Sequence, residues 1–361
     1  MSKIAICADL HFGYADRLDD IVWAIRVINK YCEHNNIDTI ICLGDSMHDR
    51  RSIDIDVYCA LYDVLAEAKQ VGLHWYTILG NHDCFLKHSW KINSAKPLSS
   101  VITVIDDVKL LKIDDRRFWC LGFIHLEASY MKVLNKINDM AEENDNLFTH
   151  IGVRGATLNT CFMLRDWNFV TFENTKFNRI YTGHFHVHQN VENKVWYPGS
   201  PIPFKHDEGD TPHGFLIFNT DTNTHEFVDI WKAGAKYIPG PAPPQFMTIL
   251  YEQIPDLTPQ DITGNIIRIV LSNDHTHDEK SQLKQSLIDN GAIKVNWLLP
   301  KIKPITPGFH NGIKLSSPGE LFVRWITHDK PEELDKKLLI KLDMETRAEG
   351  DDRYNYEEID E

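Results

Sequence analysis

Short apolar segments that end in a polar motif recur along the first half of the chain, and this pattern restricts the possible folds more than any other feature. Residues 3–8, 38–43 and 73–79 are such segments, and each predicts a buried strand. The motifs that follow them are Asp9-Leu10-His11, Gly44-Asp45 and Gly80-Asn81-His82-Asp83. Helical spacing of apolar residues over 17–33 and 56–70 predicts helices between the strands. This alternation predicts parallel strands with their polar motifs at one edge, where such sheets bind ligands.

The later part of the pattern predicts more strands and fewer helices. Residues 101–105, 109–113 and 118–123 predict closely spaced strands of an antiparallel or mixed portion, and 127–142 predicts a helix. Strands over 147–149 and 179–182 again end in histidine motifs, at His150 and at Gly183-His184-Phe185-His186. Residues 194–197, 215–219 and 226–230 predict strands that complete a second sheet. The fold class that follows is α/β, as a two-sheet α/β/β/α sandwich.

A proline-rich segment predicts a domain boundary. Pro239-Gly240-Pro241-Ala242-Pro243-Pro244 cannot continue a helix or a central strand, so it predicts a linker. We expect a first domain over 1–238 and a smaller α+β cap domain over 245–330, with strands over 266–271 and 293–298 and a helix over 278–289. Residues 331–361 are expected to continue a last helix, over 329–347, into an acidic, disordered tail.

Composition limits the class of partner and compartment. The chain has 38 Lys+Arg against 52 Asp+Glu, a net charge of −14. An acidic surface does not indicate nucleic-acid binding, but metal ions in an acidic cleft reverse the local potential, so DNA is not excluded. The 7 cysteines form no CxxC pair, which predicts reduced core thiols. No apolar stretch approaches the length of a membrane span, so we expect a cytoplasmic protein without membrane association.

Seven side chains of the motifs are candidate ligands for two divalent metal ions. They are Asp9, His11, Asp45, Asn81, His150, His184 and His186. Two ions about 3.5–4 Å apart need a shared ligand, and the short carboxylate of Asp45 at a strand end can supply it. Asp9 and His11 are two residues apart, so they leave the same side of an extended segment. Nitrogen and oxygen ligands without thiolate suit manganese, iron or zinc.

Each motif has a simpler interpretation when it is taken alone. A single Asp-x-His carries almost no functional signal, and a single His-x-His is usually a turn or a strand edge. Gly-Asn-His-Asp alone fits a tight turn as well as it fits a functional site. Their occurrence in order, each after an apolar segment, favours a metal site over a set of unrelated turns. Four other histidines have no place in a motif and are predicted to lie on the surface. They are His88, His188, His206 and His213.

Taken together, the five motifs from Asp9 to His186 resemble those of the calcineurin-like metallophosphoesterase superfamily over residues 3–186. The resemblance implies that one ion is held by Asp9, His11, Asp45 and His186. It implies that the second ion is held by Asp45, Asn81, His150 and His184. His82 would bind no metal but face the phosphate, where it would protonate the leaving oxygen or stabilise its charge. The nucleophile implied is a metal-bound hydroxide.

The residues after Asp45 distinguish branches of this superfamily. Gly44-Asp45-Ser46-Met47-His48-Asp49-Arg50 departs from the Gly-Asp-x-Val-Asp-Arg-Gly of protein Ser/Thr phosphatases. His48 instead resembles the second histidine of SbcD-like double-strand-break repair nucleases, which contributes to DNA cleavage. The turn Tyr197-Pro198-Gly199-Ser200-Pro201 is similar to a Gly-Ser-Pro turn of these nucleases, and it also suits the closing turn of a second sheet.

The resemblance to SbcD-like nucleases implies a manganese-dependent DNA exo/endonuclease subunit with an SbcC-like ABC ATPase as partner, and a homodimer is possible. A phage-encoded source would place it in the host cytoplasm. Arg50 and Arg51 are candidate DNA contacts. A stripe of leucines at 334, 338, 339 and 342 either docks on the ATPase or packs on the cap, and the sequence leaves both open. The acidic charge and a cap whose closest bases are Lys301 and Lys303 count against a DNA-tracking enzyme.

Two other functions fit the motifs. The first is a stand-alone phosphodiesterase or phosphatase that acts on a small molecule or a protein. The second is a non-catalytic scaffold on the same fold, which fits poorly because every ligand and His82 are present. Activity on linear duplex DNA against a chromogenic monoester would separate the nuclease from the stand-alone enzyme, and a purified protein without bound metal would favour the scaffold.

Overall fold

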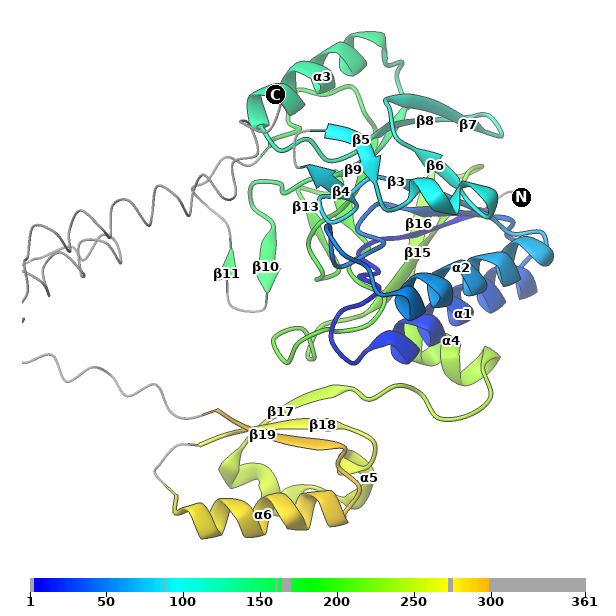
Figure 1. Ribbon diagram of the computed structural model, residues 1–361. Helices are drawn as coiled ribbons and strands as arrows, with labels where there is room; N and C mark the ends of the chain where they lie inside the picture. The colour runs from blue at the N-terminus through cyan, green and yellow to red at the C-terminus, as the bar shows by residue number, and fades with distance from the viewer. Residues whose placement is uncertain (1–2, 87–88, 160–161, 164–169, 272–274, 299–361) are drawn as a thin grey trace, which may run out of the picture. The chain divides into compact units, whose positions relative to one another are not determined.

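The computed structural model describes residues 3–86, 89–159, 162–163, 170–271 and 275–298 (Figure 1). The predicted C-terminal helix with its leucine stripe, the acidic tail, Lys301 and Lys303 lie outside the described residues, as do His88 and Cys161. No helix in the described ranges is long and apolar enough to cross a membrane.

The first sheet of the sandwich has six strands in the order β16-β15-β1-β2-β3-β6. They are β1 (Lys3–Cys7), β2 (Thr39–Cys42), β3 (His74–Ile78), β6 (Thr103–Ile105), β15 (Gly214–Asn219) and β16 (Thr224–Asp229). Strands β1, β2, β3 and β6 run parallel, whereas β15 pairs antiparallel with β1 and with β16. In register, Ile6 lies opposite Ile41 and Ile41 opposite Tyr76, so the motifs that follow β1, β2 and β3 emerge at one edge.

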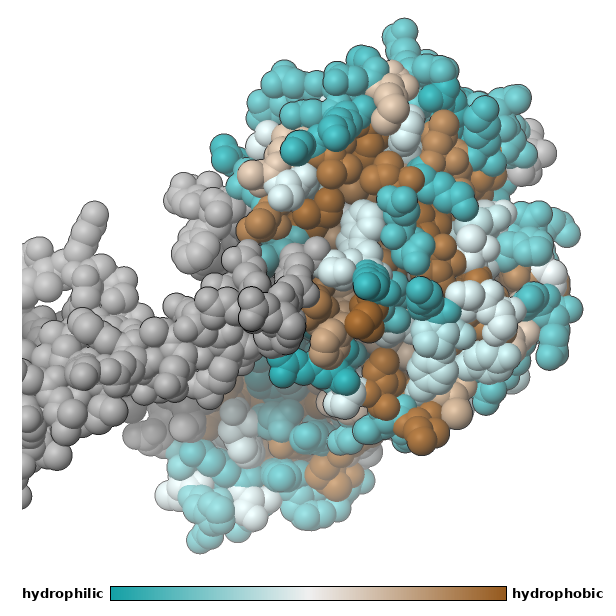
Figure 2. All heavy atoms as spheres, turned by 45° about the horizontal axis from the view of Figure 1, so that its top comes forward, coloured by the Kyte–Doolittle hydropathy of each residue, from teal (hydrophilic) through white to brown (hydrophobic). Residues whose placement is uncertain are grey.

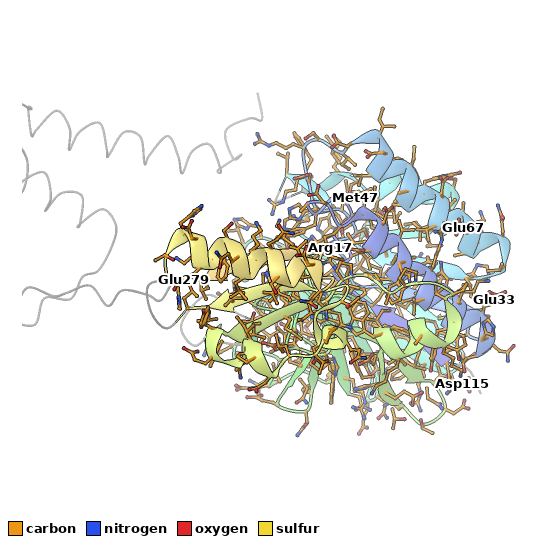
Figure 3. The ribbon with its side chains drawn as sticks, turned by 90° about the horizontal axis from the view of Figure 1, so that it is seen from below. Arg17, Glu33, Met47, Glu67, Asp115 and Glu279 are labelled. Atoms are coloured by element: carbon orange, nitrogen blue, oxygen red, sulfur yellow. The ribbon has the colours of Figure 1, made fainter. Side chains whose placement is uncertain are left out.

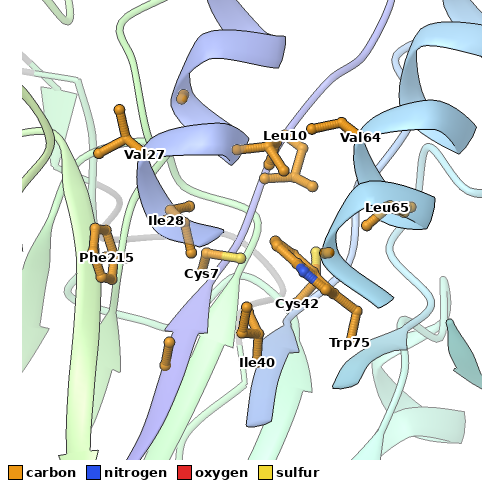
Figure 4. Packing of buried hydrophobic residues seen from close by; sticks show 14 of the residues in the cluster. Cys7, Leu10, Val27, Ile28, Ile40, Cys42, Val64, Leu65, Trp75 and Phe215 are labelled. Atoms are coloured by element: carbon orange, nitrogen blue, oxygen red, sulfur yellow. The ribbon is translucent and has the colours of Figure 1, made fainter. Parts of the chain in front are cut away.

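Three helices cover the outer face of this sheet, namely α1 (Leu18–His34), α2 (Ile55–Gln70) and α4 (Ile230–Tyr237). Ile28 of α1 and Val64 of α2 point toward Cys7 and Trp75 on the strands beneath them (Figure 4). Trp75 Nε1 donates a hydrogen bond to Asn29 Oδ1 (3.0 Å), so this buried polar pair is satisfied. Each large apolar side chain in this layer contributes about 1.5–3 kcal/mol to stability when it is fully buried.

The second sheet has the order β13-β14-β12-β9-β8-β7. Its strands are β7 (Lys109–Ile113), β8 (Arg116–Leu121), β9 (Asn146–His150), β12 (Arg179–Gly183), β13 (Gln189–Val191) and β14 (Val195–Tyr197). The four inner strands run parallel, and β7 and β13 are antiparallel edges. Helix α3 (Glu127–Met140) packs Tyr130, Leu134 and Ile137 against the outer face of this sheet.

The two sheets face each other across a shared apolar layer. Along β1, Ile6 lies in this layer, whereas the next residue, Cys7, faces the helices. Phe118 of β8 stacks on Phe148 of β9, with ring centroids 4.7 Å apart. The predicted α/β/β/α order of layers is therefore confirmed. Figure 2 shows hydrophilic side chains over much of the outer surface, with apolar ones between them.

Two predicted strands belong to a different sheet from the one expected. Residues 215–219 and 226–230 are predicted to complete the second sheet, but β15 pairs with β1 and with β16 in the first sheet. That prediction is wrong because a strand's own sequence pattern does not specify its neighbours. The portion over 101–123 is mixed, as predicted, because β6 pairs parallel with β3 and β7 pairs antiparallel with β8. The strand predicted to reach residue 230 ends at Asp229, whose carboxylate accepts a hydrogen bond from Lys232 N (3.0 Å) and so caps α4.

A third, fully parallel sheet follows the proline-rich segment. It contains β17 (Phe246–Leu250), β18 (Ile266–Val270) and β19 (Lys294–Leu298), with η2 (Tyr251–Asp256), α5 (Pro259–Ile262) and α6 (His277–Asp289). The sheet has its own apolar cluster around Ile267, Ile269 and Leu287. The sequence pattern did not predict β17. The domain boundaries at 238 and 330 stay predictions.

The remaining elements are short. They are the pairs β4 (Cys84–Leu86) with β5 (Ser89–Asn93) and β10 (Thr157–Asn159) with β11 (Phe162–Met163), and the turn of 3-10 helix η1 (Lys96–Ser100). The six cysteines within the described ranges are all free, and only Cys59 among them is exposed. Buried thiols of this kind agree with the predicted core role.

Candidate metal centre and active site

The predicted ligands converge at the edge where the parallel strands of both sheets end. Asp9 follows β1, Asp45 follows β2 and Asn81 follows β3. His150 is the last residue of β9, and His184 comes directly after β12. The two facing sheets therefore deliver all five motifs to one place, as the spacing along the sequence predicted.

The loops after β1 and β2 stay paired beyond the ends of their strands. Phe12 and Met47 form a parallel bridge, and both side chains are buried. Figure 3 shows Arg17 at the beginning of α1, with Glu33 at the opposite end of that helix. The loop after β1, which carries His11, leads directly into the amino-terminal end of α1.

One group of possible ligands consists of Asp9, His11 and His186, whose ligand atoms all lie within 4.8 Å of one another. His11 Nε2 and His186 Nε2 are 3.0 Å apart. Asp9 accepts hydrogen bonds from the backbone N of His184 at 3.0 and 3.1 Å. Ser200 N donates to the carbonyl of His186 (3.0 Å), so the Gly-Ser-Pro turn holds the histidine loop in place.

A second group consists of Asp45, His150 and His184, again within 4.8 Å. Asn81 Oδ1 lies 3.1 Å from His150 Nε2 and 2.8 Å from His184 Nδ1, so the amide oxygen belongs to the same cluster. His150 Nδ1 is 2.7 Å from the carbonyl of Leu43, to which it donates. That bond leaves the lone pair of His150 on Nε2, directed at the cluster.

Asp45 lies between the two groups. Its Oδ2 is 3.4 Å from His150 Nε2 in one group and 3.8 Å from His11 Nε2 in the other. Its Oδ1 accepts a hydrogen bond from His82 N (2.7 Å), which fixes the carboxylate. One oxygen that faces both groups has the position that a ligand shared by two ions requires.

Asp9 and Asp45 are buried at this edge among several imidazoles. Although burial opposes the charge of His150, Asp45 raises the pKa of His150 to about 9. Burial raises the pKa of Asp9 to about 6. Burial, reinforced by His150, lowers the pKa of His184 to about 3. Although burial opposes its charge, His150 holds the pKa of Asp45 below its usual range. Buried carboxylates are costly without a cation, so burial and the nitrogen and oxygen donor set both fit divalent metal ions.

The backbone at this edge is strained. Four of the candidate ligands have a left-handed backbone, namely Asp9 (φ 55°), His11 (φ 46°), Asp45 (φ 55°) and His184 (φ 101°). Such residues cost about 1–3 kcal/mol each and cluster at functional sites. Packing is also tight, because a Cβ at Gly80 would lie 2.1 Å from Asp45 Oδ1. The glycine of this motif is therefore required for close approach of the two loops.

His82 and His48 lie side by side next to the first group. Their rings are nearly parallel, with centroids 5.3 Å apart, and the ring of His11 is 4.9 Å from that of His82. His82 Nδ1 is 2.5 Å from the carbonyl of His48 and donates to it. This hydrogen bond orients the ring of His82, and Nε2 is the ring nitrogen that it does not use. The ligand atoms of His11, His48 and His82 also lie within 4.8 Å, but this group contains no carboxylate.

Asp83 has a structural role that its sequence motif does not indicate. Its buried carboxylate accepts hydrogen bonds from the backbone N of Asp45 (2.8 Å), Ser46 (2.9 Å) and Gly80 (2.9 Å). The two oxygens thereby tie the loop after β2 to the loop after β3. The position of Asp83 inside Gly-Asn-His-Asp was the only sequence signal for this role.

Glu208 is a second buried carboxylate that no sequence motif predicted. Its Oε1 lies 3.0 Å from Nδ1 of His186. Although burial opposes both charges, this hydrogen bond raises the pKa of His186 and lowers the pKa of Glu208. Glu208 follows the Gly-Ser-Pro turn at a distance and belongs to no helix or strand, so no pattern in the sequence marked it.

The other named residues lie around the site or away from it. Arg50 is half-buried and Arg51 exposed, in the loop between β2 and α2 that also carries His48. The prediction that His213 is a surface residue was wrong: it is buried, with Nδ1 3.0 Å from the carbonyl of Ser200. His188 and His206 are half-buried, and their predicted surface position holds only in part.

The comparison with protein families agrees with this geometry. A family model described as calcineurin-like phosphoesterase matches residues 2–188 of the 361 residues. The chain belongs to this family, which confirms the predicted superfamily. It is therefore a metal-dependent phosphoester hydrolase of a family that uses a dinuclear metal site, and the candidate groups described above supply side chains for such a site.

Individual relatives are distant. Exonuclease subunit 1 of Enterobacteria phage T4 is 25% identical over 252 residues, which cover 63% of this chain and 67% of the relative. The 244L protein of Invertebrate iridescent virus 6, named as a candidate phosphoesterase, is 22% identical over 235 residues, 62% of this chain and 79% of the relative. The crystal structure of a dimetal phosphatase from Danio rerio aligns at 14% identity with a TM-score of 0.38, covering 60% of this chain and 91% of the other.

Proposed function

We propose that this chain is the nuclease subunit of an SbcCD-like DNA repair or recombination complex, which hydrolyses phosphodiester bonds with two manganese ions. The observation that carries the proposal is that the loops after β2 and β3 place His48 and His82 together beside the two candidate metal groups. The similarity to a phage T4 protein named exonuclease subunit 1 supports the same branch of the family.

The seven predicted ligands would divide between the two ions. Asp9, His11 and His186 would hold one ion, and Asn81, His150 and His184 the other, with Asp45 shared. When bound, two divalent ions would activate a water molecule and draw charge from the phosphate. When both nitrogens of its ring carry hydrogen, His82 would give the proton on Nε2 to the leaving oxygen, because its Nδ1–H is held by the carbonyl of His48.

The groups around His48 fit a nucleotide strand better than a small monoester. The ring of Tyr14 lies 4.7 Å from that of His48, and Lys205 Nζ lies 6.0 Å from the Tyr14 ring centroid. Lys205 is exposed. An aromatic ring beside a cation suits a base and its phosphate, and Arg50 and Arg51 extend from the same loop as His48 as proposed DNA contacts.

The finer properties of the complex are part of the proposal. An SbcC-like ABC ATPase would supply DNA affinity that this acidic chain lacks, and the predicted C-terminal helix would be one surface for it. The cap would extend over 245–330, after a nuclease domain over 1–238. A homodimer is possible, and a phage source would place the complex in the host cytoplasm.

A stand-alone phosphodiesterase or phosphatase is the second candidate. The net charge of −14 favours it, because a DNA-tracking enzyme gains from a basic surface. Similarity to a viral protein named as a candidate phosphoesterase is equally compatible with it.

The decisive experiment compares two substrates under controlled metal content. We expect metal-stripped full-length protein to cleave linear duplex DNA after manganese is added, with little activity on p-nitrophenyl phosphate and none in excess chelator. His48→Ala should lower DNA cleavage by about 10²-fold, the typical effect of losing one group that stabilises the transition state, without loss of bound manganese. Rapid monoester hydrolysis without DNA cleavage would favour the stand-alone enzyme, and activity in excess chelator would refute the two-metal mechanism.

A further inference from the structure

Glu208 contacts two different residues of the site, His186 and Phe204, one through each carboxylate oxygen. The residue is only 6% exposed. Its Oε1 lies 3.0 Å from Nδ1 of His186, and its Oε2 accepts a hydrogen bond from Phe204 N at 2.7 Å. A buried carboxylate with both oxygens bound is held in one orientation.

The contact with Glu208 determines which nitrogen of His186 is available. A neutral imidazole carries one N–H, and a carboxylate can only accept, so the hydrogen lies on Nδ1. The lone pair is then on Nε2, the atom that lies 3.0 Å from His11 Nε2 inside the first group. Without the acceptor at Nδ1, the ring could also carry its hydrogen on Nε2, where it would block a metal ion.

The second contact of Glu208 fixes a ring that packs on the same histidines. Phe204 lies edge-on to His11, with centroids 5.5 Å apart, and its centroid is 5.5 Å from that of His186. The backbone N of Phe204 is the group that Glu208 holds. Glu208 therefore acts on His186 directly through Nδ1 and again through the packing of Phe204.

We propose that Glu208 is a positioning residue for the first metal site, which orients His186 and keeps its Nε2 directed at the ion. Outer carboxylates that accept from a metal-binding histidine commonly change metal affinity by about 10–100-fold when they are removed. The proposal rests on the proposed function, because it takes His186 as a metal ligand.

The test measures metal binding rather than turnover. Metal-stripped full-length protein is titrated with manganese by calorimetry, and its cobalt-substituted form is examined by visible absorption. We expect Glu208→Gln to bind one of the two ions about 10–100-fold more weakly and to change the cobalt spectrum. The amide of glutamine has one acceptor oxygen, so it cannot serve both His186 and Phe204.

The matched control is Glu226→Gln on β16. Glu226 is exposed, and its Oε1 lies 3.9 Å from Lys3 Nζ, so the same chemical change there should leave both manganese affinities unaltered. Equal manganese affinities and equal cobalt spectra for wild type and Glu208→Gln would overturn the proposal. A wild-type protein that binds no metal would instead overturn the proposed function, so the two failures are distinguishable.

A second measurement protects the test if Glu208→Gln does not fold. In the metal-free wild-type protein, ¹⁵N spectra of the histidine rings report which nitrogen carries the hydrogen, and the His186 signal is identified by its loss in His186→Gln. We expect hydrogen on Nδ1 of His186. Hydrogen on Nε2 of a neutral ring would show that Glu208 does not set this ring.

Discussion

Two parts of this chain are built on parallel strands but differ in what their strand ends carry. The edge of the sandwich gathers buried Asp9 and Asp45 with several imidazoles. The β17–β19 sheet packs an apolar cluster that includes Ile267 and Ile269. Within the described ranges, the groups of possible metal ligands all lie at the first edge. The carboxyl ends of parallel strands thus form an edge at which a site can be built, and the residues that follow the strands determine whether metal ligands are present there.

The difference also appears in the backbone. Asp9, Asp45 and His184 adopt left-handed φ values at the sandwich edge, whereas positive φ in the described part of 246–298 occurs at Gly264 and Gly291. Glycine adopts that region at no steric cost, but aspartate and histidine do not. Residues commonly follow their backbone preferences where only stability matters, and they depart from those preferences more often at functional sites. Turn residues such as Asn36 and Asn193 share this backbone, so it is the combination of left-handed φ with buried ligand side chains that distinguishes the metal edge.

Removal of the shared ligand Asp45 is expected to have the largest effect on metal binding at the sandwich edge. Asp45→Asn keeps the size of the side chain but removes the charge that faces both groups. We expect loss of both ions, measured by native mass spectrometry, and a fall in hydrolysis beyond the roughly 10²–10⁴-fold that follows loss of a general acid. Asp115→Asn, the same change at an exposed turn, should alter neither. Retention of two ions by Asp45→Asn would show that the bridge lies elsewhere.

The sequence could place the candidate ligands at a sheet edge because each ligand motif directly follows an apolar strand. Asp45 comes three residues after β2 and His150 ends β9, so strand prediction alone places them at an edge. Parallel register then brings motifs that are far apart in the chain together. Nothing in the local sequence, however, indicated the left-handed backbone of His11 or His184. Those conformations are imposed by the loops packed around them.

The parts that the sequence did not predict depend on long-range pairing. Strand β15 joins β1 across more than 200 residues, and its own apolar pattern fits either sheet of the sandwich. Glu208 lies in a loop, and its role follows from a contact with His186 that exists only in the folded chain. Asp83 was visible in a motif, but its backbone partners were not. Periodicity reports which face of an element is buried and does not report what covers it.

Removal of His82 should separate catalysis from metal binding at the same edge. Its ring is not among the candidate groups that contain a carboxylate, and its backbone N, which holds Asp45, is unaffected by a side-chain change. His82→Ala should keep both ions and lose about 10²–10⁴-fold in turnover, as expected for a general acid. Metal content and single-turnover rates should be measured on the same sample. A metal-free His82→Ala protein would mean that His82 is a ligand and that its proposed role is wrong.

The smallest effect on metal binding is expected from the contacts between the β17–β19 sheet and the segment that precedes Glu208. Arg268 of β18 donates to Asp207 Oδ1 (2.9 Å), and Asn296 of β19 lies 3.1 Å from His206 Nε2. Both contacts fall on the two residues that precede Glu208 in the chain. Loss of a contact at Asp207 can therefore change the position of Glu208, which holds His186.

Arg268→Ala tests whether that segment transmits the effect. Coupling through a contiguous set of contacts is typically worth 0.5–2 kcal/mol, so we expect manganese affinity at one site to fall by about 2–30-fold, measured by calorimetry on full-length protein. Arg26→Ala is the control, because Arg26 forms a similar surface pair with Glu67 (2.8 Å) across α1 and α2. Loss of either pair should change stability by no more than about 1 kcal/mol. If both variants bind manganese like wild type, the β17–β19 sheet and the metal edge are energetically independent.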